Sequence, residues 1–430
     1  NMIIRGDNLE ALKALLPRYE GRVKCIYIDP PYNTGNEGWV YNDNVNDPKI
    51  KKRLGEVVGK EGEDLTRHDK WLCMMYPRLK LLQKLLADDG VIFISIDDTE
   101  CSNLILICNE IFGASNFVAN VSWQRTYSPR NDSKGIVSEV EHLVVFSKNP
   151  GWQPNKLPRT EAMDSRYKNP DNDVAPWKSS DAFAPGAATH QGMVYAIQHP
   201  FTGEMLYPSN GRCWRYQQSS MLEYMQGWCN YRLENLHDEK ERARVCGIDE
   251  SAVRKDVLAI VLEEPLEVSA AKAQKVYNRG RWPGFYFTKG GYGGIARKTY
   301  LENVGGRLPT NLWMYEETGH TDEAKKELIS LFGGRSPFDT PKPTRLLDFV
   351  LKVAGTSETL MLDSFAGSGT TAHAVLNANK ADNGNRHFIL IEMMDYADSI
   401  TAERVKRVIK GYGEGKNAVE GTGGNFSFYD

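Results

Sequence analysis

Short apolar runs alternate with longer amphipathic stretches over the first third of the chain. The runs at 23–28 (VKCIYI) and 91–96 (VIFISI) are typical of strands buried on both faces of a parallel sheet. Between them, residues 69–86 have an apolar face at helical spacing, although Pro77 could kink this helix. Further expected elements are strands at 2–5, 117–123 and 141–147, and helices at 8–16 (with Asn8 as N-cap) and 100–111. This alternation predicts an α/β fold with a parallel or mixed sheet and helices on both faces.

The pattern stops near residue 149 and resumes near residue 336. In between, the segments are short, irregular and rich in Trp, Tyr, Gly, Pro and Asn, apart from a charged helical stretch within 238–276. The resumed elements are strands at 358–365 and 387–393 and helices at 370–380 and 397–410, followed by a glycine-rich tail expected to form a loop. The pattern predicts one α/β domain in two parts, 1–148 and 319–430, interrupted by a second domain at 149–318.

Composition and charge exclude several classes of protein. With 41% hydrophobic and 25% charged residues, the chain is ordinary for a soluble globular protein. It has no apolar run of about 18 residues and no signal-peptide pattern, so we expect a cytoplasmic protein with no membrane partner. Seven scattered cysteines form no CxxC pair, which argues against a disulfide framework and a metal site. The net charge of −3 disfavours a nonspecific polyanion binder but leaves room for a local basic groove.

The first chemical signal is the tetrapeptide Asp29-Pro30-Pro31-Tyr32, which directly follows the buried strand at 23–28. Ligands of open α/β sheets bind at the carboxyl ends of the strands. Two prolines remove two N–H donors, so the turn presents acceptors, the Asp29 carboxylate and the Pro30 carbonyl. An amino group with two hydrogens is the natural partner for two acceptors, and the Tyr32 ring offers a face for a planar base. The alternative is a plain proline-rich turn with a capping aspartate.

The second signal is the glycine-rich stretch 363–371 (DSFAGSGTT), which follows a strand and opens a helix. Glycines let a ligand approach the backbone, and a helix N-terminus favours an anion. Glu392, at the end of the next strand, is placed to hydrogen-bond the hydroxyls of a ribose. Taken alone, such a turn also fits a nicotinamide or flavin enzyme, or a structural connection. The GxGxxG spacing of dinucleotide sites is absent from it, however.

Together, the two motifs resemble the signature pair of the amino-methyltransferases that act on DNA. The order, with DPPY first and FAGSGTT after a long insertion, resembles the beta group, whose Rossmann-like S-adenosylmethionine-dependent fold is circularly permuted. The match is closer still to the modification subunits of type III restriction-modification systems. The supporting stretches are GDNLEAL (6–12), IYIDPPYNTGN (26–36), LLADDGVIFISIDDTE (85–100), GHTDEAKKEL (319–328), PFDTPKPTRLL (337–347) and GGNFSFYD (423–430). Such subunits usually carry more chain at both ends, so the natural protein could be longer.

The resemblance implies a role for each motif. The glycine-rich stretch would hold the methionine part of S-adenosylmethionine, Glu392 its ribose and Asp7 its adenine ring. Phe338, Lys342 and Pro343 match a motif that closes over the cofactor. The catalytic set that would grip the target base is Asp29, Pro30, Pro31 and Tyr32. The expected cofactor contacts in full are Asp7, Asn8, Asp29, Phe338, Thr340, Lys342, Pro343, Asp363, Ser364, Phe365, Ala366, Gly367, Ser368, Gly369, Thr370, Thr371 and Glu392.

We therefore expect a site-specific DNA methyltransferase that transfers methyl from S-adenosylmethionine to the exocyclic N6 of a flipped-out adenine, as in restriction-modification. Asp29 favours adenine, because relatives that methylate cytosine N4 often carry Ser at this place. Cytosine N4 is the main alternative, followed by an RNA-modifying enzyme, a noncatalytic specificity subunit that retains the fold, and a nicotinamide oxidoreductase. No helicase P-loop is present, so restriction would need a separate helicase-nuclease subunit. Beta-group relatives frequently dimerise, and the helix at 69–86 could contribute to a homodimer.

The inserted region 149–318 is the candidate target-recognition domain, because it places basic residues among aromatic ones. The loop 33–66 after DPPY is a second candidate for contact with double-stranded DNA. The expected DNA-contacting residues are Asn33, Arg125, Arg130, Lys134, Arg212, Arg215, Arg281, Lys289, Arg297 and Lys298. For any one of them, a solvated surface charge is the competing interpretation. His68 and His142 are expected to be structural.

Overall fold

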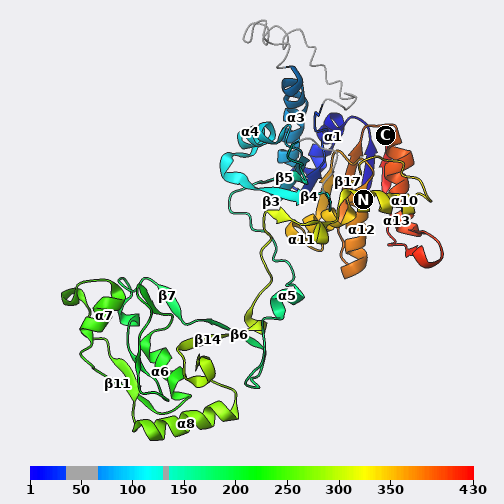
Figure 1. Ribbon diagram of the computed structural model, residues 1–430. Helices are drawn as coiled ribbons and strands as arrows, with labels where there is room; N and C mark the ends of the chain where they lie inside the picture. The colour runs from blue at the N-terminus through cyan, green and yellow to red at the C-terminus, as the bar shows by residue number, and fades with distance from the viewer. Residues whose placement is uncertain (35–65, 129–134) are drawn as a thin grey trace, which may run out of the picture. The chain divides into compact units, whose positions relative to one another are not determined.

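The computed structural model describes residues 1–34, 66–128 and 135–430 (Figure 1). These residues form two compact units. The sheet unit combines Asn1–Leu157 with Leu308–Asp430, and the inserted unit is Pro158–Arg307. Most of the loop 33–66 lies outside the described residues, as do Arg130 and Lys134. Of the helices in the described part of the chain, none combines the length and apolar character needed to cross a membrane.

A nine-stranded sheet organises the sheet unit. Across the sheet, the described strands are β15 (Leu312–Trp313), β4 (Phe117–Gln124), β5 (Val140–Ser147), β3 (Leu86–Ile96), β2 (Val23–Ile28), β16 (Leu360–Asp363), β17 (His387–Glu392), β1 (Met2–Arg5) and β20 (Ser427–Tyr429). Only β5 runs antiparallel to its neighbours among these strands. The continuous apolar runs of β2 and β3 lie side by side inside the sheet, as strands buried on both faces should.

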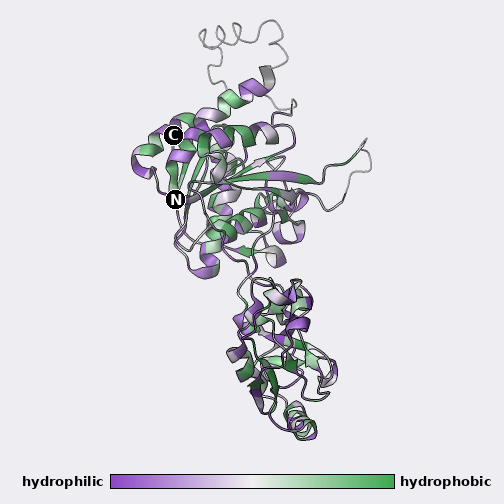
Figure 2. Ribbon diagram, turned by 90° about the vertical axis from the view of Figure 1, so that its left-hand side faces the viewer, coloured by the Kyte–Doolittle hydropathy of each residue, from purple (hydrophilic) through white to green (hydrophobic). Residues whose placement is uncertain are grey.

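Helices cover both faces of this sheet, and successive side chains of β2 belong alternately to the hydrophobic clusters on the two faces. Cys25 and Tyr27 belong to one hydrophobic cluster, and Ile26 and Ile28 belong to the other. The first cluster is covered by α10 (Thr321–Leu331), α11 (Thr344–Ala354), α12 (Thr370–Asp382) and α13 (Glu403–Lys410). The second is covered by α1 (Asn8–Tyr19), α3 (Thr66–Leu85) and α4 (Cys101–Phe112). Figure 2 shows green, hydrophobic strands between helices that carry purple, hydrophilic residues.

The pairing of β2 with β16 joins two parts of the chain that are far apart in the sequence. The strands run parallel, with Cys25 opposite Met361 and Ile26 opposite Leu362. Their carboxyl ends therefore meet at one edge of the sheet. The turns 29–32 and 363–371, which follow these ends, are brought to the same place.

Two local predictions in the sheet unit are wrong. Asp7, not Asn8, caps α1, because its Oδ1 accepts a hydrogen bond from the Leu9 amide at 2.7 Å, while Asn8 is the buried first residue of the helix. The tail is not all loop, because β20 pairs with β1 and places Ser427 opposite Met2. α3 also continues through Pro77 as one helix. Smaller elements of this unit are α9 (Tyr315–Thr318), a π-helical turn (Ala397–Ala402), β18 (Gly411–Tyr412) and β19 (Val419–Glu420).

The inserted unit packs small sheets and helices around aromatic side chains. Its described strands are β6 (Trp177–Asp181), β7 (Phe183–Pro185), β8 (Ile197–Gln198), β9 (Met205–Leu206), β10 (Arg212–Trp214), β11 (Tyr231–Glu234), β12 (Ala259–Leu262), β13 (Phe285–Phe287) and β14 (Ile295–Tyr300). Its helices are α5 (Glu161–Asp164), α6 (Gln218–Gln226), α7 (Glu239–Cys246) and α8 (Leu266–Arg279). Trp177, Trp214, Trp228 and Phe285 are buried together in its core. Many aromatic residues of this region therefore serve packing.

Lys298 of β14 is enclosed in this unit, which does not fit the predicted contact with DNA. Its ammonium lies 2.5 Å from an oxygen of Asp171 and also bonds Asp173 and the Trp282 carbonyl. The Trp177 ring lies beside it, with its centroid 4.9 Å away. A charge with no exposed surface and three oxygen partners has no donor left for a phosphate. Lys298 instead neutralises two carboxylates inside the unit.

Replacing Lys298 by Met should destabilise the inserted unit. The substitution leaves the fully buried Asp171 without a counter-charge, which costs about 3–5 kcal/mol in comparable sites. Hydrogen exchange of β14 peptides under increasing denaturant would measure the loss within this unit. Lys289→Met, at an exposed position of the same unit, is the matched control. Unchanged protection in Lys298→Met would show that the ion pair is unimportant for stability.

Candidate active site

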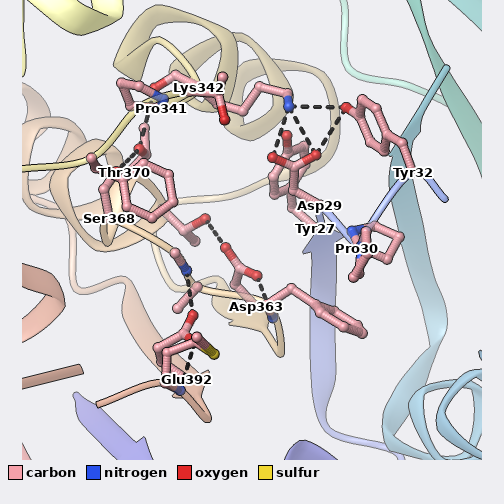
Figure 3. A pocket seen from close by; sticks show the side chains of 18 of the residues that line it. Tyr27, Asp29, Pro30, Tyr32, Pro341, Lys342, Asp363, Ser368, Thr370 and Glu392 are labelled. Atoms are coloured by element: carbon pink, nitrogen blue, oxygen red, sulfur yellow. Dashed lines mark hydrogen bonds and ion pairs between the residues drawn. The ribbon is translucent and has the colours of Figure 1, made fainter. Parts of the chain in front are cut away.

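A cavity of about 490 Å³ lies where β2 and β16 end (Figure 3). Both sequence motifs line it. The predicted site residues in its wall are Asp29, Pro30, Pro31, Tyr32, Arg125, Phe338, Thr340, Lys342, Asp363, Phe365, Ala366, Gly367, Ser368, Thr370, Thr371 and Glu392. All of them belong to the sheet unit. The fold thus builds one site from both parts of the sheet unit.

Residues 29–32, here called the acceptor corner, present the Asp29 carboxylate to this cavity. The Tyr32 hydroxyl donates to Asp29 Oδ1 at 2.9 Å, and its oxygen lies 3.1 Å from Glu141 Oε2. Behind the corner, the indole N–H of the buried Trp71 donates to the Pro31 carbonyl at 2.7 Å. The two prolines and this hydrogen bond fix the backbone, so the corner needs little reorganisation to receive a ligand.

Lys342 holds the acceptor corner directly, where the resemblance implied only a contact with the cofactor. Its Nζ donates to both oxygens of Asp29, at 2.8 and 2.7 Å, and to the Tyr32 oxygen at 2.9 Å. Burial would lower the pKa of the Lys342 ammonium, but Asp29 and Glu141 outweigh burial and raise that pKa above its usual value. Burial raises the pKa of Asp29, and the Lys342 charge opposes this rise. In this structure an ammonium group therefore occupies the acceptors of the corner.

Glu141 is a buried carboxylate of the site that the sequence did not single out. It comes from the beginning of β5, and its Oε2 lies 3.6 Å from the Lys342 ammonium. Its other oxygen accepts from Arg125 at 3.0 Å. Arg125 was expected to flank the DNA, and it lies in the cavity wall with its side chain 42% exposed. No local motif surrounds Glu141, so its role emerges only when β5 is placed beside β3.

The glycine-rich turn forms the opposite wall. Asp363 accepts from the Phe365 amide at 3.0 Å and from the Thr371 hydroxyl at 2.6 Å, which fixes its carboxylate at the strand end. Burial, with smaller contributions from Asp29 and Glu392, raises the pKa of Asp363 to about 7. This carboxyl group therefore changes its charge within the neutral pH range.

Both the backbone conformation and the space at Gly367 favour glycine. Its φ is +51°, and a Cβ there would lie 3.3 Å from the Phe338 ring across the cavity. The Gly367 amide donates to Glu392 Oε2 at 2.8 Å, and the Met394 amide donates to Oε1 at 3.0 Å. Burial raises the pKa of Glu392. These bonds hold Glu392 at the end of β17, beside the turn.

Several predicted cofactor contacts do not line the cavity. They are Asp7, Asn8, Pro343, Ser364 and Gly369. Asn8 supports the site from behind, since its side chain donates to the Ser364 carbonyl at 3.0 Å and accepts from Arg78. Pro343 and Gly369 precede α11 and α12 as their N-terminal caps. These residues therefore shape the turns that carry the lining side chains.

The predicted DNA contacts that the structure describes are divided between the two units. Asn33, next to the acceptor corner, is buried and turns its amide to Glu100 at 2.5 Å. In the inserted unit, Arg212 pairs with Asp181 at 2.7 Å, and Arg297 is half-buried. Arg215, Arg281 and Lys289 are exposed in the same unit. Of the residues predicted in this unit, these three offer the most accessible charges.

Further lining residues were missed by sequence reasoning. They are Tyr27, Glu141, Pro341, Met394 and Tyr396. Tyr27 looks like one more apolar position of β2, but its hydroxyl pairs with Ser95 at 2.8 Å. Tyr396 and Met394 follow Glu392, so their position after a strand end was the available signal.

The comparisons with known proteins agree with this geometry. A profile of the family described as DNA methylase matches residues 23–403. The chain belongs to this family. It is 32% identical to the Mod subunit of the type III restriction-modification enzyme StyLTI of Salmonella typhimurium, over 95% of this chain and 57% of that protein. It is 30% identical to the EcoPI Mod subunit of Escherichia phage P1, over 91% and 57% respectively.

Other relatives differ in how much of their length is matched. The type II methyltransferase M.KpnI of Klebsiella pneumoniae is 28% identical over 90% of this chain and 79% of that protein. Among solved structures, the PvuII DNA methyltransferase (cytosine-N4-specific) is 13% identical with a TM-score of 0.41, over 94% of this chain and 86% of that one. The chain spans 57% of the length of each of the StyLTI and EcoPI subunits. The predicted family and α/β fold are confirmed, and S-adenosylmethionine is the methyl donor of this family.

The residues present fit this donor. Four carboxyl groups line the cavity, those of Asp29, Glu141, Asp363 and Glu392, against the two cationic groups of Arg125 and Lys342. Such a wall favours a ligand with a positive sulfonium and a positive ammonium, and it repels the two phosphates of a nicotinamide cofactor. The small glycine turn leaves space beside Phe338 that a side chain would fill. Charge and shape therefore both match S-adenosylmethionine.

The raised pKa of Asp363 predicts a pH-dependent affinity for S-adenosylhomocysteine, the product form of the donor. As the pH rises to about 7, the carboxyl group loses its proton and gains attraction for the ligand's ammonium. Affinity should rise with pH between 5.5 and 7, at most about tenfold per unit for one proton, and then level off. Calorimetry would measure this, with 5′-methylthioadenosine, which lacks the amino-acid part and therefore its ammonium, as the control ligand. Equal pH profiles for both ligands would contradict the prediction.

Proposed function

We propose that the protein methylates the exocyclic N6 of adenine in double-stranded DNA, with S-adenosylmethionine as the methyl donor. One observation carries the proposal: the acceptor corner and the glycine-rich turn line the same cavity. A methyl donor held by the turn and an amino group held by the corner would face each other there. Holding both reactants in line supplies the entropic part of the acceleration.

The bond network of Lys342 supports an amino group as the ligand of the acceptor corner. The corner already binds a nitrogen with several hydrogens, through Asp29 and Tyr32. The hydrogens of a target amine would meet the same acceptors once the flexible Lys342 side chain withdraws. The Tyr32 ring offers a face for the base. The contacts of Lys342 thus support the acceptor corner as the proposed binding place of the target nitrogen.

The residues of the corner would lower the barrier by acting on the target nitrogen. When bound, S-adenosylmethionine supplies an electrophilic methyl group on a positively charged sulfur. The exocyclic nitrogen of adenine is a poor nucleophile because its lone pair is conjugated into the ring. Asp29, as an acceptor outside the ring plane, would favour a tetrahedral nitrogen and balance the positive charge that grows on it. The same carboxylate is placed to take the proton that nitrogen must lose after it gains the methyl carbon.

We propose adenine N6 rather than cytosine N4 as the target, because relatives that methylate cytosine N4 often carry Ser at the place of Asp29. The geometry of the acceptor corner itself would serve either amine. The target base must leave the duplex to reach a strand end, which costs a few kcal/mol.

A noncatalytic specificity subunit would not need an intact Asp29, Tyr32 and glycine-rich turn. These three features together support an enzyme. The charge of the cavity wall disfavours the nicotinamide alternative.

The inserted unit is proposed as the part that recognises the DNA sequence. Arg215, Arg281 and Lys289 are exposed there and would contact phosphates or base edges.

A separate restriction subunit and a homodimer are proposed as partners. An apolar groove between α3 and α4, lined by Leu72, Tyr76 and Leu106 among others, would suit the homodimer, since Leu106 is 68% exposed.

Methylation-sensitive sequencing of DNA from a host that expresses the protein tests this function. We expect N6-methyladenine in one short sequence context. Methylated cytosine N4 in that context would correct the base assignment. Unmodified DNA, from a host with the folded protein, would contradict the proposal.

Asp29→Ala should strongly slow methyl transfer while the donor still binds. Loss of an acceptor that stabilises developing charge typically lowers the rate by about 10²–10³-fold. A filter assay with radiolabelled donor would measure turnover, and calorimetry would measure affinity for the donor. Asp98→Ala, after the end of the neighbouring β3, is the control, because Asp98 is exposed and does not line the cavity. Near-normal turnover of Asp29→Ala would reject the mechanism.

A further inference from the structure

Arg404 lies fully buried behind the glycine-rich turn, where no sequence motif predicted a charge. It belongs to α13, and its side chain has no exposed surface. One end of its guanidinium donates to the Ser368 hydroxyl oxygen at 2.9 Å and to that of Thr370 at 2.8 Å. Ser368 and Thr370 both line the cavity. The guanidinium therefore reaches the donor site through two hydroxyl groups.

The other end of the guanidinium is tied to the surrounding helices. The nitrogen at this end lies within hydrogen-bond distance of three acceptors, Glu327 Oε2 at 2.9 Å, the Thr344 hydroxyl oxygen at 3.0 Å and His373 Nδ1 at 3.2 Å. Burial, reinforced by Arg404, lowers the pKa of His373 well below its usual value, so the imidazole is neutral and can accept. A buried ion pair of this kind adds little stability compared with apolar packing. Stability alone therefore does not explain why the opposite end of the guanidinium is bonded to two hydroxyl groups of the cavity wall.

The hydroxyl groups of Thr370 and Ser368 differ in the acceptors available to their hydrogens. The Thr370 hydroxyl donates to the Lys342 carbonyl at 3.2 Å, which ties the turn to the segment that carries Lys342. The Ser368 oxygen receives the Arg404 N–H, and the nearest acceptor for its own hydrogen, Thr370, is 3.3 Å away. The Ser368 hydrogen can therefore point into the cavity. A hydroxyl that accepts from a cation is also a stronger donor.

We propose that Arg404 is a positioning residue that makes the Ser368 hydroxyl the binding point for the carboxylate of the methyl donor. This inference rests on the proposed function and specifies how the amino-acid part of S-adenosylmethionine is oriented. The N-terminus of α12 at Thr370 adds a positive end to the same place. Asp363, whose carboxyl group follows the preceding strand, suits the ammonium of the same ligand. The turn thereby distinguishes the two charged ends of the amino acid.

Arg404→Met tests the proposal with two ligands in the absence of DNA. S-adenosylmethionine has the carboxylate, whereas decarboxylated S-adenosylmethionine keeps the sulfonium and the ammonium but lacks it. Calorimetry should show that affinity for the first falls about ten- to hundredfold, the usual range for losing a hydrogen bond to a charged group. Affinity for the second should change less than about twofold. An equal loss for both ligands, or no loss for the first, would overturn the proposal.

Ser368→Ala and a control variant separate this role from folding. Ser368→Ala removes only the donor and should show the same selective loss, so it decides the question even if Arg404→Met does not fold. Arg407→Met, one turn further along α13, removes a cation that pairs with Glu403 and should leave both affinities unchanged. If Ser368→Ala weakens both ligands equally or neither, the inference fails.

The outcomes also separate this inference from the proposed function. A wild-type protein that methylates DNA but shows no ligand-selective loss in Ser368→Ala keeps its function and loses the Arg404 role. A wild-type protein that binds neither S-adenosylmethionine nor its decarboxylated form contradicts both proposals.

Discussion

The parallel pairing of β2 with β16 is the constraint on which the site depends. The pairing places Ile26 opposite Leu362, so the residues three positions further, Asp29 and Phe365, follow the two strand ends at the same level. A shift by one residue would turn each side chain to the other face of the sheet. The register is specified because both faces are buried, with Cys25 and Ile26 in different hydrophobic clusters. Core packing therefore determines the distance between the two halves of the site.

Electrostatics give this site its selectivity. Carboxyl groups collected in a partly buried cavity repel one another, and burial raises the pKa of Asp29, Asp363 and Glu392. A buried cation offsets this cost at the acceptor corner, where Lys342 pairs with Asp29. The remaining negative charge favours a cationic ligand. Within the described residues, the chemistry of the cavity thus follows from a balance of buried charges as much as from its shape.

The sequence predicts those parts of this structure that have a local signature. β2 and β3 are continuous apolar runs, and DPPY and the glycine stretch combine residue types that few other structures require. Glu141 and Arg404 have no such signature, because a single charged residue at the end of a strand or within a helix looks like a solvated one. Their roles arise from tertiary packing, which brings β5 beside β3 and α13 behind the turn.

In the inserted unit and the tail, the local sequence pattern led to one wrong prediction and one missed strand. Lys298 stands among aromatic residues and was predicted to contact DNA, but the pairing of β14 with β6 buries it against Asp171. A basic residue near aromatics has the same local pattern in a DNA-binding surface and in a core. The pairing of β20 with β1 was likewise missed, since a strand of three residues at a sheet edge has too few positions to show an alternation.

Lys342 contacts both halves of the site, the glycine-rich turn through its backbone and the acceptor corner through its side chain. Its carbonyl accepts from Thr370 in the glycine turn, while its ammonium lies on Asp29 in the acceptor corner. Two residues later, Thr344 bonds to Arg404 and so returns to the same turn. The segment 342–344 therefore contacts both the glycine-rich turn and the acceptor corner. Strand pairing sets the two motifs side by side, and these hydrogen bonds join them a second time.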